Sequence, residues 1–211
     1  MSEQFDQAFW DERYRSQTAL WSGNPNRHLV AETDALAPAA ALDVGAGEGA
    51  DAIWLAGRGW RVTAVDVSAV ALERASGHAD EAGAAVAERI YWLRQDALDW
   101  DPGLDRYDLV SAQYLQFPRE PRRVLFDRLA SAVAPGGTLL IVGHHPTDLH
   151  AVPHPHSPEL LYTGDEIAAE LDATSWEIVT NTAAERSATH DGRPVVLHDT
   201  VLRARRHPRI R

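Results

Sequence analysis

The chain has 211 residues, of which 45% are apolar, and this suits one well-buried domain better than two. Its 31 acidic residues outnumber its 20 basic ones and give a net charge of −11, which argues against a nucleic-acid partner because phosphate binding needs clustered positive charge. The absence of cysteine excludes disulfides, thiolate nucleophiles and zinc sites built on cysteine.

Residues 1–39 predict a helical cap segment. Phe5, Phe9, Trp10 and Tyr14 recur at helical spacing within residues 3–15, which predicts a short helix with an aromatic face. Residues 21–26 are rich in turn formers, and a second helix is expected over residues 28–36. The start has no basic region followed by an apolar stretch, and no apolar run reaches the roughly 18 residues of a membrane span. We therefore expect a cytoplasmic protein without membrane contact.

Residues 40–211 predict the core of a single structural domain. Short β-type runs alternate with helical patterns, which is typical of a parallel sheet with helices on both faces. Strands are expected at residues 41–44, 61–65, 89–93, 107–111 and 138–142, and helices at 50–57, 69–82 and 121–133. Ser68 is a candidate cap for the helix over residues 69–82, and residues 135–137 are expected to break the chain before the fifth strand.

The remaining chain predicts a loop, a helix and two strands. Residues 144–158 are rich in His and Pro and indicate an irregular loop. Thr163 and Glu166 fit a capping box that opens a helix reaching residue 171. Residues 176–180 and 195–202 are expected to form an antiparallel pair at the sheet edge.

A glycine loop follows the first expected strand, where residues 43–49 read Asp-Val-Gly-Ala-Gly-Glu-Gly. Its glycines let the backbone turn tightly and come close to a ligand, and Asp66 at the end of the next strand can accept hydrogen bonds from a ribose. This arrangement predicts a nucleoside pocket. Alternatively, Asp66 only caps the helix that follows it.

Asp43 indicates which nucleoside the pocket takes. It lies two positions before Gly45, where its negative charge would oppose a pyrophosphate but could hold a cationic amino group. This favours a sulfonium amino-acid nucleoside over NAD. The alternative is a strand-end carboxylate that backbone donors satisfy.

Five segments resemble the motifs of class I S-adenosylmethionine-dependent methyltransferases in order and spacing. They are residues 43–49, Asp66, residues 95–97 (Gln-Asp-Ala), residues 107–110 (Tyr-Asp-Leu-Val) and residues 135–137 (Pro-Gly-Gly). The resemblance covers the chain from about residue 40 onward and implies a Rossmann-like, doubly wound α/β fold. The implied seven-stranded sheet has the order 3-2-1-4-5-7-6, with its last strand antiparallel.

Residues 9–14 (Phe-Trp-Asp-Glu-Arg-Tyr) and 21–26 (Trp-Ser-Gly-Asn-Pro-Asn) resemble the tellurite-resistance and thiopurine methyltransferase branch. In that branch the N-terminal segment folds over the cofactor and helps to bound the acceptor site. One departure is Ala46, where relatives often carry cysteine.

The resemblance implies S-adenosylmethionine as the cofactor. Asp43 would face the methionyl amino group, Asp66 the ribose, and Asp96 the adenine amino group. The full expected cofactor site comprises Asp43, Gly45, Ala46, Gly47, Gly49, Asp66, Val67, Asp96, Ala97, Gln113, Arg13 and Trp21. Asp96 could equally be an exposed loop acid, Gln113 could serve ordinary loop packing, and Arg13 and Trp21 could serve packing alone.

Tyr114, His144 and His145 are the expected catalytic residues. Tyr114 follows the fourth strand, from which this fold reaches the transferred methyl, although ordinary loop packing is an alternative. The two histidines leave the carboxyl end of the fifth strand and are candidate general bases. We expect no metal site at His144, His145, His150, His154 and His156, because prolines separate several of them and no helical pair of ligands is evident.

The sequence thus predicts an enzyme that transfers a methyl group by in-line displacement to a small-molecule acceptor, which is a thiol, a chalcogen oxyanion or a hydroxyl. An NAD(P)-dependent oxidoreductase and a non-catalytic S-adenosylmethionine-binding module remain alternatives. Binding of NAD in place of S-adenosylhomocysteine would favour the first, and turnover of labelled donor would exclude the second. The sequence does not give the oligomeric state.

Overall fold

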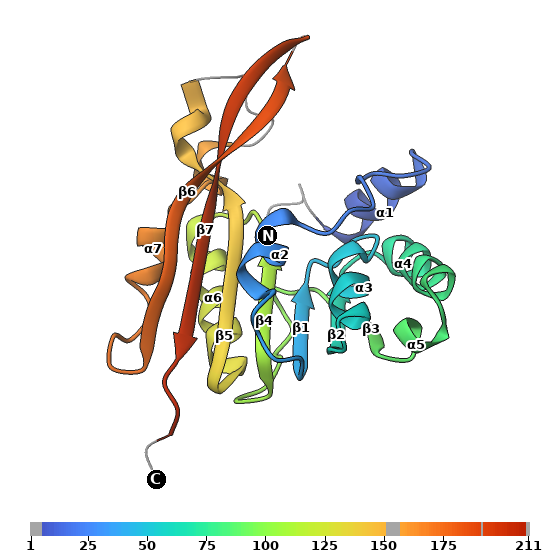
Figure 1. The fold of residues 1–211 in the computed structure, drawn as a ribbon. Coiled ribbons are helices and arrows are strands. Elements are labelled where there is room, and N and C mark those ends of the chain that lie inside the picture. The colour runs from blue at the N-terminus through green and yellow to red at the C-terminus, as the bar shows by residue number, and fades with distance from the viewer. Residues whose placement is uncertain (1–5, 151–156, 191, 210–211) are drawn as a thin grey trace.

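A twisted sheet runs through the centre of the computed structural model, which describes residues 6–150, 157–190 and 192–209 (Figure 1). Its seven strands are β1 (Ala40–Val44), β2 (Arg61–Asp66), β3 (Ile90–Arg94), β4 (Tyr107–Gln113), β5 (Val133–His144), β6 (Trp176–His190) and β7 (Arg193–Arg206). Their order is β3-β2-β1-β4-β5-β7-β6, in which β7 is antiparallel to both of its neighbours. The predicted fold class and strand order are therefore confirmed.

Helices cover both faces of the sheet. They are α1 (Gln7–Arg15), α2 (Arg27–Thr33), α3 (Ala50–Gly57), α4 (Ala69–Ala82), α5 (Ala84–Ala87), α6 (Arg119–Ala132) and α7 (Gly164–Ala168). Leu29 of α2 and Leu55 of α3 pack on one face, and Leu125 of α6 and Ile167 of α7 pack on the other. Within the described ranges, no helix combines the length and the apolarity needed to cross a bilayer.

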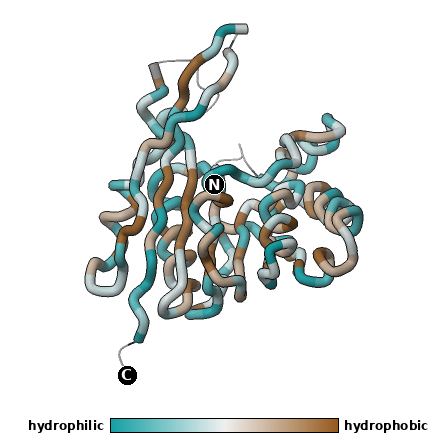
Figure 2. Tube along the Cα trace, in the orientation of Figure 1, coloured by the Kyte–Doolittle hydropathy of each residue, from teal (hydrophilic) through white to brown (hydrophobic). Residues whose placement is uncertain are grey.

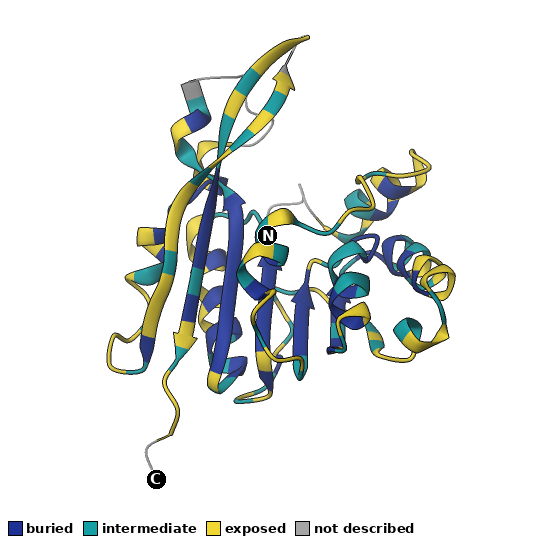
Figure 3. Cartoon of the chain, in the orientation of Figure 1, coloured by how far each residue is buried: buried dark blue, intermediate teal, exposed yellow. Residues whose placement is uncertain are grey.

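The inner strands β1, β2, β4 and β5 are largely buried because apolar residues occupy both of their faces. Leu109 and Val110 of β4 are adjacent, point to opposite faces and are fully buried in the two separate apolar clusters. The strands in the middle of the sheet are accordingly buried in Figure 3, whereas the edge strand β6 is mostly exposed, and Figure 2 shows the hydropathy of each segment. Full burial of one such side chain contributes about 1.5 to 3 kcal/mol, so the sheet is a rigid platform for the loops at its edge.

Two predicted helix caps are confirmed. The Ser68 hydroxyl accepts a hydrogen bond from the backbone N–H of Ala71, and Thr163 and Glu166 form a reciprocal capping box at the start of α7. Helix boundaries differ more. α2 ends at Thr33, α7 ends at Ala168, and the short α5 was not predicted. Residues 3–5 of the first expected helix lie outside the described residues.

The expected break at residues 135–137 is wrong. The chain remains extended there, and β5 begins at Val133. The register against β4 shifts between Tyr107 and Leu109, so this segment is absorbed as a bulge, in which Gly136 adopts a positive φ of 86°. Residues 135–137 (Pro-Gly-Gly) thus mark a bulge within β5 and not a break before it.

The expected loop over residues 144–158 is also partly wrong. His144 still belongs to β5, and two short 3₁₀ helices, Pro146–His150 and Pro158–Leu160, follow it. Residues 151–156 lie outside the described residues.

The last two strands are much longer than predicted and form a ribbon, defined here as residues 185–190 of β6 and 193–198 of β7. β7 pairs with β5 only up to Asp199, and the ribbon extends past the end of the sheet (Figure 1). Arg186, Ala188, Val195 and Leu197 form its half-buried face, and Ser187, Thr189, Pro194 and Val196 on the opposite face are exposed. Because residues 181–190 are mostly polar, the hydrophobic pattern did not predict that β6 continues through them.

Candidate functional site

The glycine loop connects β1 to α3 and is held against the end of β2. The Asp66 carboxylate accepts a 2.8 Å hydrogen bond from the backbone N–H of Gly47 and another of 2.8 Å from that of Ser68. Gly47 has a φ of +54°, and a Cβ atom there would lie 3.0 Å from the hydroxyl of Tyr14. Glycine is therefore required both by the turn and by the side chain above it.

Three carboxyl groups gather around this loop. Asp43 is the penultimate residue of β1, Asp66 ends β2, and Asp51 lies in the first turn of α3. Burial, followed by the charges of Asp51 and Asp66, raises the pKa of Asp43 well above its ordinary value. Burial also raises the pKa of Asp66, and it raises the pKa of Asp51 to about 6. The site disfavours so much negative charge unless a cation joins it.

Asp43 has one oxygen without a partner among the described residues. Its Oδ2 atom is buried and accepts no hydrogen bond, although Asp43 as a whole is only 1% exposed. An unsatisfied buried carboxylate oxygen costs more than one that is hydrogen-bonded. A ligand with an ammonium group would supply both the missing donor and the missing charge, so these residues fit the methionyl amino group of S-adenosylmethionine. They do not fit a pyrophosphate.

The N-terminal segment is fastened directly onto the glycine loop. The Glu48 carboxylate accepts hydrogen bonds from the backbone N–H groups of Leu20 and Trp21, at 3.0 and 3.1 Å. Arg74 of α4 pairs with Glu48 at 2.9 Å and donates to the carbonyl oxygens of Tyr14 and Gln17. The segment that links α1 to α2 therefore closes over the loop.

A second attachment holds α1 itself. Asp11 is 7% exposed and accepts a 2.6 Å hydrogen bond from the hydroxyl of Ser68, directly after β2. Trp21 donates from its indole N–H to the hydroxyl of Tyr14, yet 52% of Trp21 is exposed. Arg13 lies over the ring of Trp10, and the arginine that bonds to the glycine loop is Arg74.

The residues expected to bind adenine are exposed or half-buried. Asp96 is exposed, and its carboxylate accepts a 2.9 Å hydrogen bond from the backbone N–H of Leu98, which gives it a local turn role. Ala97 is half-buried against the core, and Val67 is half-buried directly after Asp66. The adenine contacts of these residues stay predictions.

The structure brings Tyr114 and His144 together at the ends of β4 and β5. Their rings lie 4.7 Å apart between centroids. Tyr114 has a φ of +54°, an uncommon value for a residue other than glycine and one that often accompanies functional sites. Gln113 precedes it and donates to the Ser111 hydroxyl, while its side-chain oxygen has no hydrogen-bond partner within the described part of the chain.

His145 is separated from this pair. Its backbone N–H donates to the carbonyl of His198, and its Nδ1 accepts from the backbone N–H of Thr147. Burial lowers its pKa. His198 in turn contacts buried Asp148 at 2.8 Å. The two adjacent histidines therefore face different surroundings, and the general-base role of each stays a prediction.

Among the described residues, no three His, Cys, Asp or Glu side chains are grouped as metal ligands. The side chain of His150, together with His154 and His156, lies outside the described residues. The expected absence of a metal site at these three histidines therefore stays a prediction.

A buried carboxylate that the sequence analysis did not select lies beside Tyr114 and His144. Asp199 of β7 is fully buried, and its oxygens lie 3.0 Å from Arg186 Nε and 3.2 Å from His28 Nε2. His144 Nδ1 lies 3.7 Å away. These contacts hold the pKa of Asp199 far below its ordinary value despite its burial. The one available sequence signal was an acid within the predicted strand over residues 195–202, between apolar residues 195–197 and 201–202.

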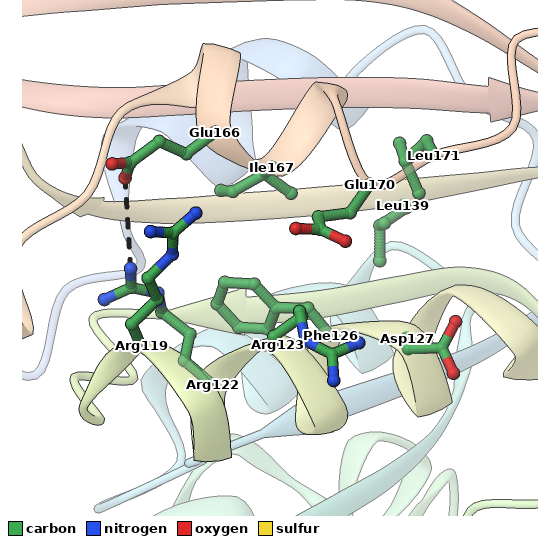
Figure 4. Close-up of a pocket in the computed structure, with 10 residues that line it drawn as sticks. All are labelled: Arg119, Arg122, Arg123, Phe126, Asp127, Leu139, Glu166, Ile167, Glu170 and Leu171. Atoms are coloured by element: carbon green, nitrogen blue, oxygen red, sulfur yellow. Dashed lines mark ion pairs between the residues drawn. The ribbon is translucent and has the colours of Figure 1, made fainter.

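A small hollow lies elsewhere, between α6 and α7 (Figure 4). Arg122 and Glu166 pair at 3.9 Å across it, over a floor that includes Phe126 and Leu139. Its volume of about 50 Å³ holds little more than a water molecule or two. It is too small for a nucleoside.

Residues 41–137 match a family described as a methyltransferase domain. An uncharacterized methyltransferase of Mycobacterium tuberculosis (strain ATCC 25618 / H37Rv) is 36% identical over 122 residues, which is 56% of this chain and 59% of that protein. The chain thus spans less than two thirds of the relative's length.

Two solved structures share the fold over nearly the whole chain. One comes from work on the conversion of a disulfide bond into a thioacetal group during echinomycin biosynthesis. It is 25% identical with a TM-score of 0.73, and the match covers 95% of this chain and 91% of that chain. The other is TehB from Haemophilus influenzae, which is 17% identical with a TM-score of 0.69, over 94% of this chain and 66% of that chain.

Proposed function

We propose that this protein transfers a methyl group from S-adenosylmethionine to a small-molecule acceptor, because residues 41–137 match a methyltransferase domain. The observation that carries the proposal is the buried, unpartnered Oδ2 of Asp43 beside the glycine loop. The acceptor is a thiol, a chalcogen oxyanion or a hydroxyl. The acidic chain disfavours nucleic acid as the acceptor.

The donor would be held along the carboxyl edge of β1, β2 and β3. Asp43 would bind its cationic amino group, the glycine loop would pass beneath it, and Asp66 would accept from its ribose. The other residues proposed to contact the donor are Ala46, Val67, Asp96, Ala97, Gln113, Arg13 and Trp21. When bound, the donor supplies an electrophilic methyl group on a sulfonium.

In such a reaction the protein mainly positions the donor and the acceptor. Holding two reactants in line in a dry site can supply about 7 to 11 kcal/mol. The contacts of Glu48 with Leu20 and Trp21 close the cap over the loop, and this closure supports the exclusion of water from the donor. His144 and Tyr114, at the ends of neighbouring strands, would face the acceptor.

We assign the protein to the tellurite-resistance and thiopurine methyltransferase branch within the same proposal. The support is the N-terminal motif, whose Asp11 binds Ser68 and whose Trp21 binds Glu48. These contacts between the N-terminal segment and the glycine-loop region support the assignment.

Calorimetric titration tests the proposal directly. S-Adenosylhomocysteine should bind the protein, NAD should not, and Asp43→Asn should weaken the binding at least tenfold. Glu73→Gln, on the exposed face of α4, is the matched control and should leave the affinity unchanged. Binding of NAD in place of S-adenosylhomocysteine would establish the oxidoreductase alternative. A screen of thiols, phenols, sugars, selenite and tellurite, followed by S-adenosylhomocysteine release, then identifies the acceptor class.

A further inference from the structure

Asp199 and His144 lie directly opposite each other in the antiparallel pair of β7 and β5. Side chains of opposed residues lie on the same face of a sheet, and here both point toward the end of β4, where Tyr114 stacks on His144. Asp199 is fully buried, whereas 23% of the His144 side chain is exposed. A buried carboxylate thus lies behind a histidine that reaches the surface of the site.

The imidazole is oriented by this arrangement. Nδ1 of His144 lies 3.7 Å from Oδ1 of Asp199, and catalytic hydrogen bonds are often this long before substrate binds. A carboxylate facing Nδ1 favours the tautomer that carries its proton there, which leaves Nε2 as the basic nitrogen. The same logic orients the histidine of a catalytic triad.

We propose that Asp199 is a positioning residue that holds His144 as the general base for a protic acceptor, with an O–H or S–H group. This inference rests on the proposed methyl transfer and names the acceptor chemistry of the same site. It selects the hydroxyl and the thiol over the chalcogen oxyanion, which has no proton to remove before attack.

In the proposed step, the acceptor O–H or S–H bond breaks and its proton moves to Nε2 of His144, while the electron pair of that bond attacks the methyl carbon. The carbon–sulfur bond of the donor breaks, and its electron pair stays on the sulfur. Asp199 stabilises the resulting imidazolium, which later releases the proton to water.

Four further groups face this pair and affect its charge. Arg186 of β6 and Arg27 of α2 bring positive charge to Asp199, at 3.0 and 3.7 Å. His28 of α2 lies 3.2 Å from Oδ2, the oxygen that Arg27 also contacts, and Tyr114, directly after β4, contacts the same carboxylate. Two arginines already neutralise part of the charge of Asp199. The tautomer of His144 therefore reports the contact with Asp199 more directly than the size of any pKa change.

The first experiment needs no acceptor. Long-range ¹H–¹⁵N spectra of the full-length protein at pH 8 should show His144 mainly as the Nδ1–H tautomer. Asp199→Asn should remove that preference. His28→Gln breaks another contact of Asp199 without touching His144 and should retain the preference. An Nε2–H tautomer in the wild-type protein would overturn the proposal even if the Asp199 variant failed to fold.

The second experiment compares acceptor classes with the wild-type protein and His144→Gln. The probes are 2-mercaptoethanol, catechol and tellurite, with S-adenosylhomocysteine release as the readout. We expect transfer to the thiol or to the phenol, a loss of kcat of at least about 100-fold in His144→Gln, and little change in KM for the donor. The alkaline-rising limb of the kcat profile should disappear in Asp199→Asn and persist in His28→Gln. Transfer to tellurite alone, or an undiminished rate in His144→Gln, would refute the inference.

The failure of the proposed function would look different. If S-adenosylhomocysteine did not bind at all, methyl transfer itself would be excluded, whatever the tautomer of His144. If it bound normally and only the histidine results failed, the methyltransferase proposal would stand without this base.

Discussion

Glu48 of the glycine loop accepts a 3.1 Å hydrogen bond from the backbone N–H of Trp21, a residue 27 positions earlier in the chain. The same carboxylate oxygen accepts from Leu20, and its other oxygen pairs with Arg74. Glu48 is only 7% exposed, so these contacts form a shielded link. One side chain thus couples the seating of the N-terminal cap to the loop beneath the proposed donor.

Replacement of Glu48 by Ala should release the cap. The N–H groups of Leu20 and Trp21 lose their acceptor, and Arg74 loses its partner, which costs about 1 to 3 kcal/mol in the free energy of unfolding. Hydrogen exchange should accelerate in residues 14–21 more than in the strands, and S-adenosylhomocysteine should bind more weakly. Glu73→Gln is the control in both measurements. Unaltered exchange in residues 14–21 would show that other contacts seat the cap.

Asp66→Ala should weaken S-adenosylhomocysteine binding by at least ~1 kcal/mol, about fivefold in Kd, while the fold survives. The carboxylate accepts from Gly47 and from Ser68, so the variant would lose both the proposed ribose contact and the support of the loop. Calorimetry measures the affinity, and circular dichroism checks the fold. An affinity equal to that of the wild type would leave Asp66 with its loop and cap roles alone.

The glycine loop could be predicted from the sequence, whereas the surroundings of His144 could not, for a physical reason. The glycine loop and Asp66 lie in local strand-to-helix turns whose spacing is set by short-range backbone geometry. Asp199 reaches His28 and His144 only through the pairing of distant strands, and no spacing in the chain encodes that pairing. The ribbon was missed for a related reason, because its strand residues are polar and its length depends on pairing.

The buried carboxylates at the loop predict a pH dependence of binding. Burial raises the pKa of Asp51 to about 6, and burial also raises the pKa of Asp43 well above its ordinary value. Since a cationic ligand favours the ionised forms, S-adenosylhomocysteine affinity should fall as the pH decreases from 8 to 5, and binding near pH 6 should release protons. Calorimetry in buffers of different ionisation enthalpy measures that release. Affinity independent of pH over this range would contradict the assignment of these groups to the ligand.

The same groups act oppositely on the stability of the ligand-free protein. A carboxyl whose folded pKa lies above its unfolded value contributes stability that is fully present below the unfolded pKa of 3.8 and is lost as the pH rises through about 6. For Asp51 this contribution is at most about 3 kcal/mol. Asp51→Asn should therefore be less destabilising, relative to the wild type, at pH 7 than at pH 4. Urea unfolding at the two pH values checks the sign, and a difference in the other direction would contradict the raised pKa.

Gly49 and Gly57 offer a matched test of the loop at the two ends of α3. Gly49 precedes the helix with a φ of +87°, and a Cβ there would lie 2.7 Å from the ring of Trp92 and 2.8 Å from Cβ of Ala75. Gly57 is the last helical residue, and a Cβ there would meet nothing within 4 Å.

Gly49→Ala should therefore cost about 1 to 3 kcal/mol in the free energy of unfolding, because it adds both backbone strain and a steric clash. Gly57→Ala should be neutral or stabilise the protein by up to about 1 kcal/mol, because alanine restricts the unfolded chain and suits a helix. Urea unfolding of both variants measures the difference. Since Trp92 lies in β3, which leads to the proposed adenine contacts, Gly49→Ala should also weaken S-adenosylhomocysteine binding, whereas Gly57→Ala should not. Equal effects of the two substitutions would mean that Trp92 and Ala75 yield readily, and that the close approach at Gly49 is not what fixes the loop.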